Sequence, residues 1–121
     1  MAVRGIDHIL LAMPAGREQD ARDFYSGILG LTEKKKPQQL QDRGGCWFEL
    51  GHMQVHLGVE ENFVPPKKAH PAFIVDDLAG IVRNAKAGGY RVTEDVPVEG
   101  YDRRHIYDPF GNRIELIEPH R

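Results

Sequence analysis

The sequence has few of the features that assign a chain to a specialised class of protein. Its single cysteine, Cys46, has no partner for a disulfide within the chain. No apolar run approaches the ~20 residues that span a bilayer, and the first residues lack the charged-then-apolar order of a signal peptide. The formal net charge of -2 favours neither nucleic acid nor an anionic membrane as a partner. These absences predict a cytoplasmic protein that binds neither nucleic acid nor a membrane.

Several motifs that would identify a reaction are also missing. The sequence has no glycine-rich phosphate loop, no nucleophile elbow and no paired-cysteine zinc motif. The run Lys34–Lys36 lies between Glu33 and Pro37, a pattern that predicts a solvated loop and not a phosphate-binding patch. Cys46 has no neighbouring base, which argues against a nucleophile. Any functional site must therefore be formed by residues scattered along the sequence, among them six histidines.

The 121 residues, 40% apolar and 28% charged, predict one globular domain with a substantial core. Apolar runs, helical spacing and turn residues predict the same order of elements twice. The first copy comprises a strand at 5–13 covered on both faces, a helix at 17–29, a strand at 31–36, a mobile loop at 37–45, and strands at 46–50 and 53–60. The second comprises a strand at 69–75, a helix at 78–87 capped by Asp76 or Asp77, and strands at 90–94, 104–107 and 113–117.

The two copies also match in individual residues. The matching positions are His8 with His70, Leu31-Thr32-Glu33 with Val92-Thr93-Glu94, and His56 with Glu115. A repeat of about sixty residues in two copies is too long for a solenoid and predicts a duplicated module packed about a pseudo-twofold axis.

The repeat places four side chains that can bind metals at two pairs of equivalent positions. His8 and His70 both open a strand, while His56 and Glu115 both lie in the last strand of a copy. Equivalent positions converge on a pseudo-twofold axis, and imidazoles with a carboxylate suit a divalent ion that keeps open positions for substrate. We therefore predict His8, His70 and Glu115 as metal ligands. His56 is either a fourth ligand or an acid/base.

The same residue types also occur in purely structural roles. A single histidine is often only a packed residue, and Glu115 could pair with a nearby arginine. Arg103, His105 and Tyr107 alternate along one strand, so they are substrate-orienting candidates if that face lines a cavity, and ordinary surface residues if it does not. Trp47 is predicted to form part of the core or of a cavity wall.

Four segments carry a resemblance to a known family. They are Ile6-Asp7-His8-Ile9-Leu10-Leu11-Ala12, Asp23-Phe24-Tyr25, Leu29-Gly30-Leu31 and Asp108-Pro109-Phe110-Gly111-Asn112-Arg113-Ile114-Glu115-Leu116. With the repeat, they resemble the vicinal oxygen chelate superfamily, which includes glyoxalase I, extradiol dioxygenases, fosfomycin-resistance transferases and bleomycin-resistance proteins. The resemblance implies an α+β fold in a single domain, 1–121, with βαβββ modules at about 4–60 and 68–118. Its curved mixed sheets form a cleft, within or between the subunits of a homodimer.

The resemblance also implies a chemistry. Family members bind one divalent ion (zinc, nickel, iron, manganese or cobalt) at positions matching His8, His70 and Glu115. At the position matching His56, glyoxalase I has a glutamate ligand, and extradiol dioxygenases keep a histidine as acid/base. We expect a glyoxalase-like lyase or isomerase for a small substrate chelated through neighbouring oxygens, with His56 or Glu115 moving the proton. The alternatives are an extradiol-type dioxygenase and a non-catalytic protein that binds a drug or metabolite.

Overall fold

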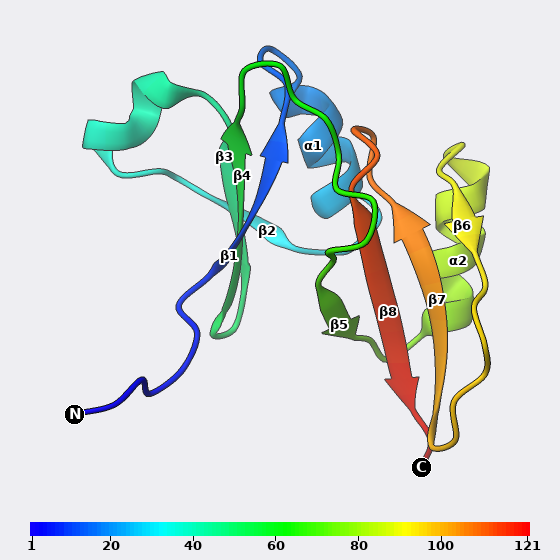
Figure 1. Cartoon of the computed structure of the whole chain (residues 1–121). Helices are drawn as coiled ribbons and strands as arrows, with labels where there is room; N and C mark the ends of the chain where they lie inside the picture. Colours follow the sequence, from blue (N-terminus) through cyan, green and yellow to red (C-terminus); the bar gives the residue numbers. More distant parts are fainter. The chain divides into compact units, whose positions relative to one another are not determined.

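A computed structural model describes all residues from Met1 to Arg121, which form two compact units, residues 1–63 and 64–121. Unit 1 contains β1 (Ile9–Met13), α1 (Glu18–Tyr25), β2 (Thr32–Lys34), the 3₁₀ helix η1 (Gln38–Arg43), β3 (Cys46–Leu50) and β4 (Met53–Val59). Unit 2 contains β5 (Ala72–Ile74), α2 (Leu78–Ala87), β6 (Val92–Thr93), β7 (Tyr101–Tyr107) and β8 (Arg113–Pro119). The predicted α+β fold, with strand, helix and three strands occurring twice, is confirmed (Figure 1).

Each unit builds one four-stranded mixed sheet. The strand order is β1-β4-β3-β2 in unit 1 and β5-β8-β7-β6 in unit 2. In both, the first and last strands of the unit pair in parallel, and the other pairs are antiparallel. This follows from the connections, because hairpins join antiparallel strands, whereas parallel strands need a longer crossover. No helix of the chain is long and apolar enough to cross a membrane.

The core of unit 1 lies between α1 and one face of its sheet. Phe24 and Tyr25 of α1 are fully buried, and the Tyr25 ring stacks on Phe48 with centroids 5.5 Å apart. Phe48 pairs with Val55, which is also fully buried. Because successive side chains of a strand point to opposite faces, Trp47 and His56 lie on the face away from α1.

Unit 2 has the same layering. Fully buried Ile106, Ile114 and Leu116 fill one face of its sheet, and α2 adds Leu78 and Ala85. Of the two predicted caps, Asp77 is the N-cap, since its carboxylate accepts a hydrogen bond from the Gly80 amide at 3.0 Å. Glu118 of β8 accepts from the Leu78 amide at 2.7 Å, which ties the first turn of α2 to the sheet.

Three sequence predictions for unit 1 are wrong in detail. The first strand begins at Ile9 and not at Gly5, and it is not covered on both faces, because Leu10 keeps 60% of its surface exposed. Helix α1 ends at Tyr25, four residues short of the predicted end at Leu29.

The predicted mobile loop at 37–45 instead contains η1. Its ends are held by hydrogen bonds. The Lys36 ammonium donates to the Gly44 carbonyl, and Gln41 donates to the Lys36 carbonyl at 3.0 Å. The expectation of a solvated loop for the lysine run also fails, since Lys34 is the last residue of β2, and Lys34 and Lys36 are half-buried.

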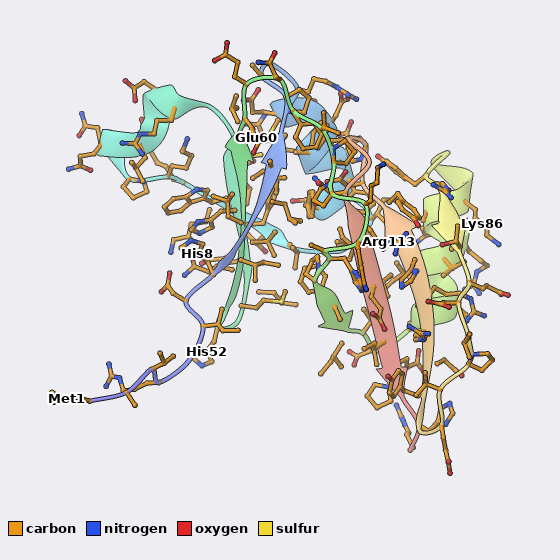
Figure 2. All side chains as sticks on the ribbon, in the orientation of Figure 1. Met1, His8, His52, Glu60, Lys86 and Arg113 are labelled. Carbon is orange, nitrogen blue, oxygen red and sulfur yellow. The ribbon has the colours of Figure 1, made fainter.

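One row of side chains crosses each sheet on the face away from its helix. The row of unit 1 is Lys34, Trp47, His56 and Leu10, contributed by β2, β3, β4 and β1. The row of unit 2 is Thr93, His105, Glu115 and Ala72, contributed by β6, β7, β8 and β5. His8 precedes Leu10 by two residues, as His70 precedes Ala72, so the predicted equivalence of these positions holds. Figure 2 shows His8 on the segment that leads into β1.

Candidate functional site

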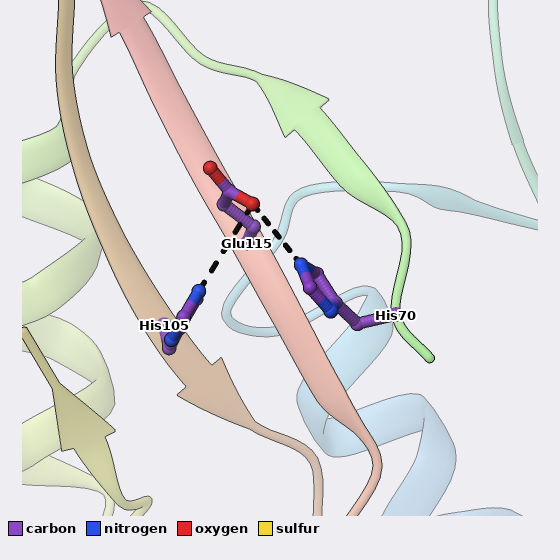
Figure 3. Close-up of side chains that lie close together, drawn as sticks. All are labelled: His70, His105 and Glu115. Carbon is purple, nitrogen blue, oxygen red and sulfur yellow. Dashed lines mark hydrogen bonds and ion pairs between the residues drawn. The ribbon is translucent and has the colours of Figure 1, made fainter. Parts of the chain in front are cut away.

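A cluster of three metal-capable side chains lies on the sheet face of unit 2 away from α2. His70 comes from the segment before β5, His105 from β7 and Glu115 from β8 (Figure 3). The Glu115 Oε1 is 3.1 Å from the Nε2 of His70 and 4.0 Å from the Nε2 of His105. All three ligand atoms lie within 4.8 Å of one another. Donors bound at about 2.1 Å lie at most about 4.2 Å apart, so small side-chain movements would bring all three onto one ion.

His70 is held in an orientation that suits a ligand. Its Nδ1 lies 2.6 Å from the Lys68 carbonyl oxygen, which can only accept a hydrogen bond, so Nδ1 carries a proton. In the neutral ring, Nε2 then presents a lone pair toward the Glu115 carboxylate at 3.1 Å. Two acceptors at this distance need a proton or a metal cation between them. Histidine ligands of metals characteristically donate from the other ring nitrogen to a carbonyl or carboxylate.

His105 is buried and its Nε2 has no hydrogen-bond partner. Its side chain is 7% exposed, and the closest carboxylate oxygen, on Glu115, is 4.0 Å away. Burial, and then the charge of Arg113, lower the pKa of His105, which keeps the imidazole neutral. A buried polar atom without a partner costs about 1–3 kcal/mol. A bound cation would satisfy this nitrogen, so the residues present fit a divalent ion.

The two oxygens of the Glu115 carboxylate face different partners, Arg103 on one side and the imidazoles on the other. The Nη1 of Arg103 lies 3.4 Å from Oε2, which leaves Oε1 toward the imidazoles. The guanidinium is fixed by two hydrogen bonds to the Val96 carbonyl, at 2.8 and 3.2 Å, and by an ion pair with Asp95 at 3.5 Å. Arg103 thus orients the Glu115 carboxylate.

Tyr107 shares the sheet face of Arg103 and His105, as the alternation predicted, but it makes different contacts. Its ring lies under the guanidinium groups of Arg91, at 4.5 Å, and Arg113, at 5.7 Å. A hydrogen bond to the Thr93 side chain is the main cause of a lowered pKa of the Tyr107 phenol. Tyr107 is therefore part of a cationic aromatic contact next to the cluster.

In unit 1 the equivalent positions hold a stack of three rings. The His56 ring is parallel to His8 on one side, with centroids 4.0 Å apart and planes at 13°, and to Trp47 on the other, at 3.7 Å and 3°. The Nδ1 of His8 is 2.9 Å from an Asp7 carboxylate oxygen, and the Nε2 of His56 is 3.1 Å from the Gln54 side-chain oxygen.

His56 is neutral in this environment. It is 3% exposed, and burial, followed by the nearby charge of His8, lowers its pKa to about 4. At neutral pH the ring therefore offers a lone pair from its edge, since both of its faces are covered. Such a ring can bind a metal or accept a proton.

The structure thus brings the predicted ligands together within each unit, His70 with Glu115 and His8 with His56. It adds His105, which the sequence suggested only as a substrate-orienting residue. A signal for His105 was present, because joining the predicted strands 104–107 and 113–117 as a hairpin places His105 directly opposite Glu115.

Comparison with known proteins agrees with this fold. The family model of the Glyoxalase/Bleomycin resistance protein/Dioxygenase superfamily matches residues 5–116. A glyoxalase family protein from Bacillus anthracis is 42% identical, with 99% of this chain and 98% of that chain covered and a TM-score of 0.91. No curated protein matches the sequence.

Two more distant structures share the fold. A glyoxalase/dioxygenase from Nostoc punctiforme is 23% identical over 98% of this chain and 92% of that chain, with a TM-score of 0.80. The fosfomycin resistance protein FosX from Listeria monocytogenes is 17% identical over 99% and 94%, with a TM-score of 0.76.

Proposed function

This chain belongs to the Glyoxalase/Bleomycin resistance protein/Dioxygenase superfamily, and we propose that it is a metal-dependent enzyme acting on a small oxygenated molecule. The observation that carries the proposal is the contact of 3.1 Å between His70 and Glu115, beside the unpartnered nitrogen of buried His105. Such a buried group is costly in a purely structural role and useful in a metal centre.

In this proposal His70 and Glu115 are metal ligands and His105 is the third donor. Two imidazoles and one carboxylate suit zinc, nickel, iron, manganese and cobalt alike. A divalent ion held by these residues would supply Lewis-acid chemistry to neighbouring oxygens of the substrate. Arg103 would hold the Glu115 carboxylate in place.

The reaction proposed first is a glyoxalase-like lyase or isomerase step, which requires a group that accepts a proton from the substrate. Two assignments made from the sequence stay predictions, namely His8 as a ligand and His56 as a ligand or acid/base. Metal analysis separates them. If His56 moves the proton, His56→Gln loses turnover and retains metal, whereas His8→Ala loses metal. The location in the cytoplasm also stays a prediction.

Two alternative functions can be distinguished from the proposed one by experiment. An extradiol-type dioxygenase requires oxygen-sensitive iron(II) and turnover of a catechol. A non-catalytic drug- or metabolite-binding protein is favoured by one observation, a pocket of about 580 Å³ in unit 1 that includes Trp47 and none of the unit 2 cluster. Unchanged ligand affinity after removal of the metal would support this second rival.

A homodimer is the proposed assembly. β1 and β5 are edge strands of their sheets, and they expose Leu10 at 60% and Ile74 at 78%. Open edges with exposed apolar side chains favour pairing with another chain. Sedimentation as a monomer at micromolar concentration would contradict the proposal.

Elemental analysis of freshly purified protein tests the metal centre directly. We expect about one divalent ion per chain, and a decrease in affinity of at least about 100-fold for Glu115→Gln and His70→Ala, since even residues behind the ligands contribute 10–100-fold. His52→Ala is the matched control, because His52 is an exposed turn histidine outside the cluster. Metal content unchanged in Glu115→Gln would overturn the proposal.

A further inference from the structure

A pocket of about 580 Å³ lies on the face of the unit 1 sheet that carries the row of Lys34, Trp47, His56 and Leu10. This volume lies within the range of small-molecule sites. Its walls come from the row and from the connection between β2 and β3, and they include Lys34, Lys36, Leu40, Arg43, Trp47 and His56. The 3₁₀ helix η1, which the sequence did not predict, provides the outer part of this wall.

The pocket has a surplus of positive charge. Three cationic side chains line it, against one carboxylate, that of Asp7. The Asp7 carboxylate already faces His8 at 2.9 Å. Lys34 is only loosely compensated, because the Glu49 carboxylate is 3.8 Å from its ammonium group.

The other two cations are not paired with a carboxylate of the chain. Lys36 donates to the carbonyl of Gly44, a neutral group, and Arg43 forms no ion pair within the chain. A guanidinium without a partner at the edge of a pocket is suited to bind a carboxylate or phosphate through two parallel hydrogen bonds.

The pocket also has an aromatic and apolar lining. The Trp47 indole is half-buried and stacked on His56, which fixes its plane, and Leu40 and Leu10 add apolar surface. A ligand that fills the pocket therefore meets both cationic side chains and an aromatic plane with aliphatic groups.

We propose that this pocket binds a small molecule through its anionic group, a carboxylate, phosphonate or phosphate, held by Arg43 with Lys36 and Lys34. The apolar or unsaturated part of the same molecule lies against Trp47. That the bound molecule is a substrate rests on the proposed function, whereas the binding of an anion does not.

Trp47 is the only tryptophan of the chain and lies in the pocket, so its fluorescence reports binding there. We would titrate protein treated with a chelator with phenylphosphonate, benzoate and the neutral benzamide. We expect saturable fluorescence changes with the two anions and affinity at least about tenfold lower for benzamide, because charge-assisted hydrogen bonds are lost. The ratio of the two anion affinities distinguishes a phosphonate or phosphate site from a carboxylate site.

Matched variants locate the binding. Arg43→Gln is expected to weaken binding of the preferred anion about tenfold, whereas Lys35→Gln removes the same charge from an exposed lysine that does not line the pocket. Equal effects of the two variants, or no saturable binding of either anion, would overturn the proposal.

The titration is repeated with Glu115→Gln. Anion binding that persists there while the wild type proves free of metal would refute the proposed function and leave the pocket standing.

Discussion

In unit 1 the row positions contributed by β3 and β4 carry Trp47 and His56, and in unit 2 the equivalent positions carry His105 and Glu115. The histidine that precedes the first strand is present in both, as His8 and His70. With the same strand order and the same register, unit 1 forms a stack of aromatic rings and unit 2 forms a polar cluster around a carboxylate.

The residues differ at both of these positions, and a charged side chain occurs only at the position of Glu115. The Glu115 carboxylate has one oxygen 3.4 Å from the Arg103 guanidinium and the other 3.1 Å from the Nε2 of His70. A neutral imidazole at His56 requires no counter-charge, and its two faces are covered by rings instead. One framework therefore supports a cluster of metal-capable groups in one unit and an aromatic pocket wall in the other.

The largest expected effect concerns the turn that precedes Glu115. Asp108 is 4% exposed, and its carboxylate accepts hydrogen bonds of 2.9 Å from the amides of Phe110 and Asn112 and from the Asn112 side chain. Asp108→Ala leaves these donors without this acceptor, and we expect a loss of about 3 kcal/mol or more in the free energy of unfolding, measured in urea.

The corresponding turn of unit 1 provides the control. Gly51 and His52, between β3 and β4, are exposed. His52→Ala is therefore expected to change the free energy of unfolding by no more than about 0.5 kcal/mol. Similar losses for Asp108→Ala and His52→Ala would show that the two turns are equivalent.

The next effect is stabilisation by metal. A divalent ion at 100 times its dissociation constant stabilises the folded state by about 2.7 kcal/mol. We expect thermal unfolding with and without zinc to show this increase for the wild type and for Trp47→Leu, but not for Glu115→Gln. An equal increase in all three proteins would place the ion outside the cluster of unit 2.

Smaller effects on stability are expected from substitutions at two equivalent ring positions, His105 in unit 2 and Trp47 in unit 1. In protein treated with a chelator, His105→Leu removes a buried nitrogen without a partner, so we expect stability unchanged or increased by about 1 kcal/mol. Trp47→Leu loses the stack on His56 and is expected to cost about 1 kcal/mol. A clear destabilisation by His105→Leu in the absence of metal would mean that its imidazole is satisfied by the protein itself.

The smallest effect involves Cys46, which only unit 1 contains. Burial raises the pKa of its thiol from 9.0 to about 11. The folded state therefore keeps a proton that the unfolded state loses, so stability is unaffected below pH 9 and decreases as the pH rises from 9.0 to about 11. We expect iodoacetamide to label the native protein slowly at pH 8 and the urea-unfolded protein quickly. Rapid labelling of the native protein would indicate that unit 1 opens enough to expose the Cys46 thiol.

Much of the fold was predictable from residue patterns because those patterns are local. Apolar periodicity identified the order of elements, and one of the two predicted caps, Asp77, caps α2, since both features depend on neighbours within a few residues. One predicted match between the copies was wrong. The sequence matched Thr93 with Thr32, whereas strand pairing makes Thr93 equivalent to Lys34. The structural reason is that Lys34 and Thr93 each follow a glycine with positive φ, Gly30 or Gly89, by four residues.

The candidate site was predictable only in part, for the same reason. The sequence by itself determined that two modules repeat and that His8, His70, His56 and Glu115 occupy equivalent positions, because these statements need only spacing. Only the tertiary structure decided which groups meet. Strand pairing brings His105 opposite Glu115, and hydrogen bonds within the β2–β3 connection turn an expected mobile loop into the cationic wall of a pocket. Contacts across strands depend on register and on partners far away in the chain, and spacing along one strand does not specify them.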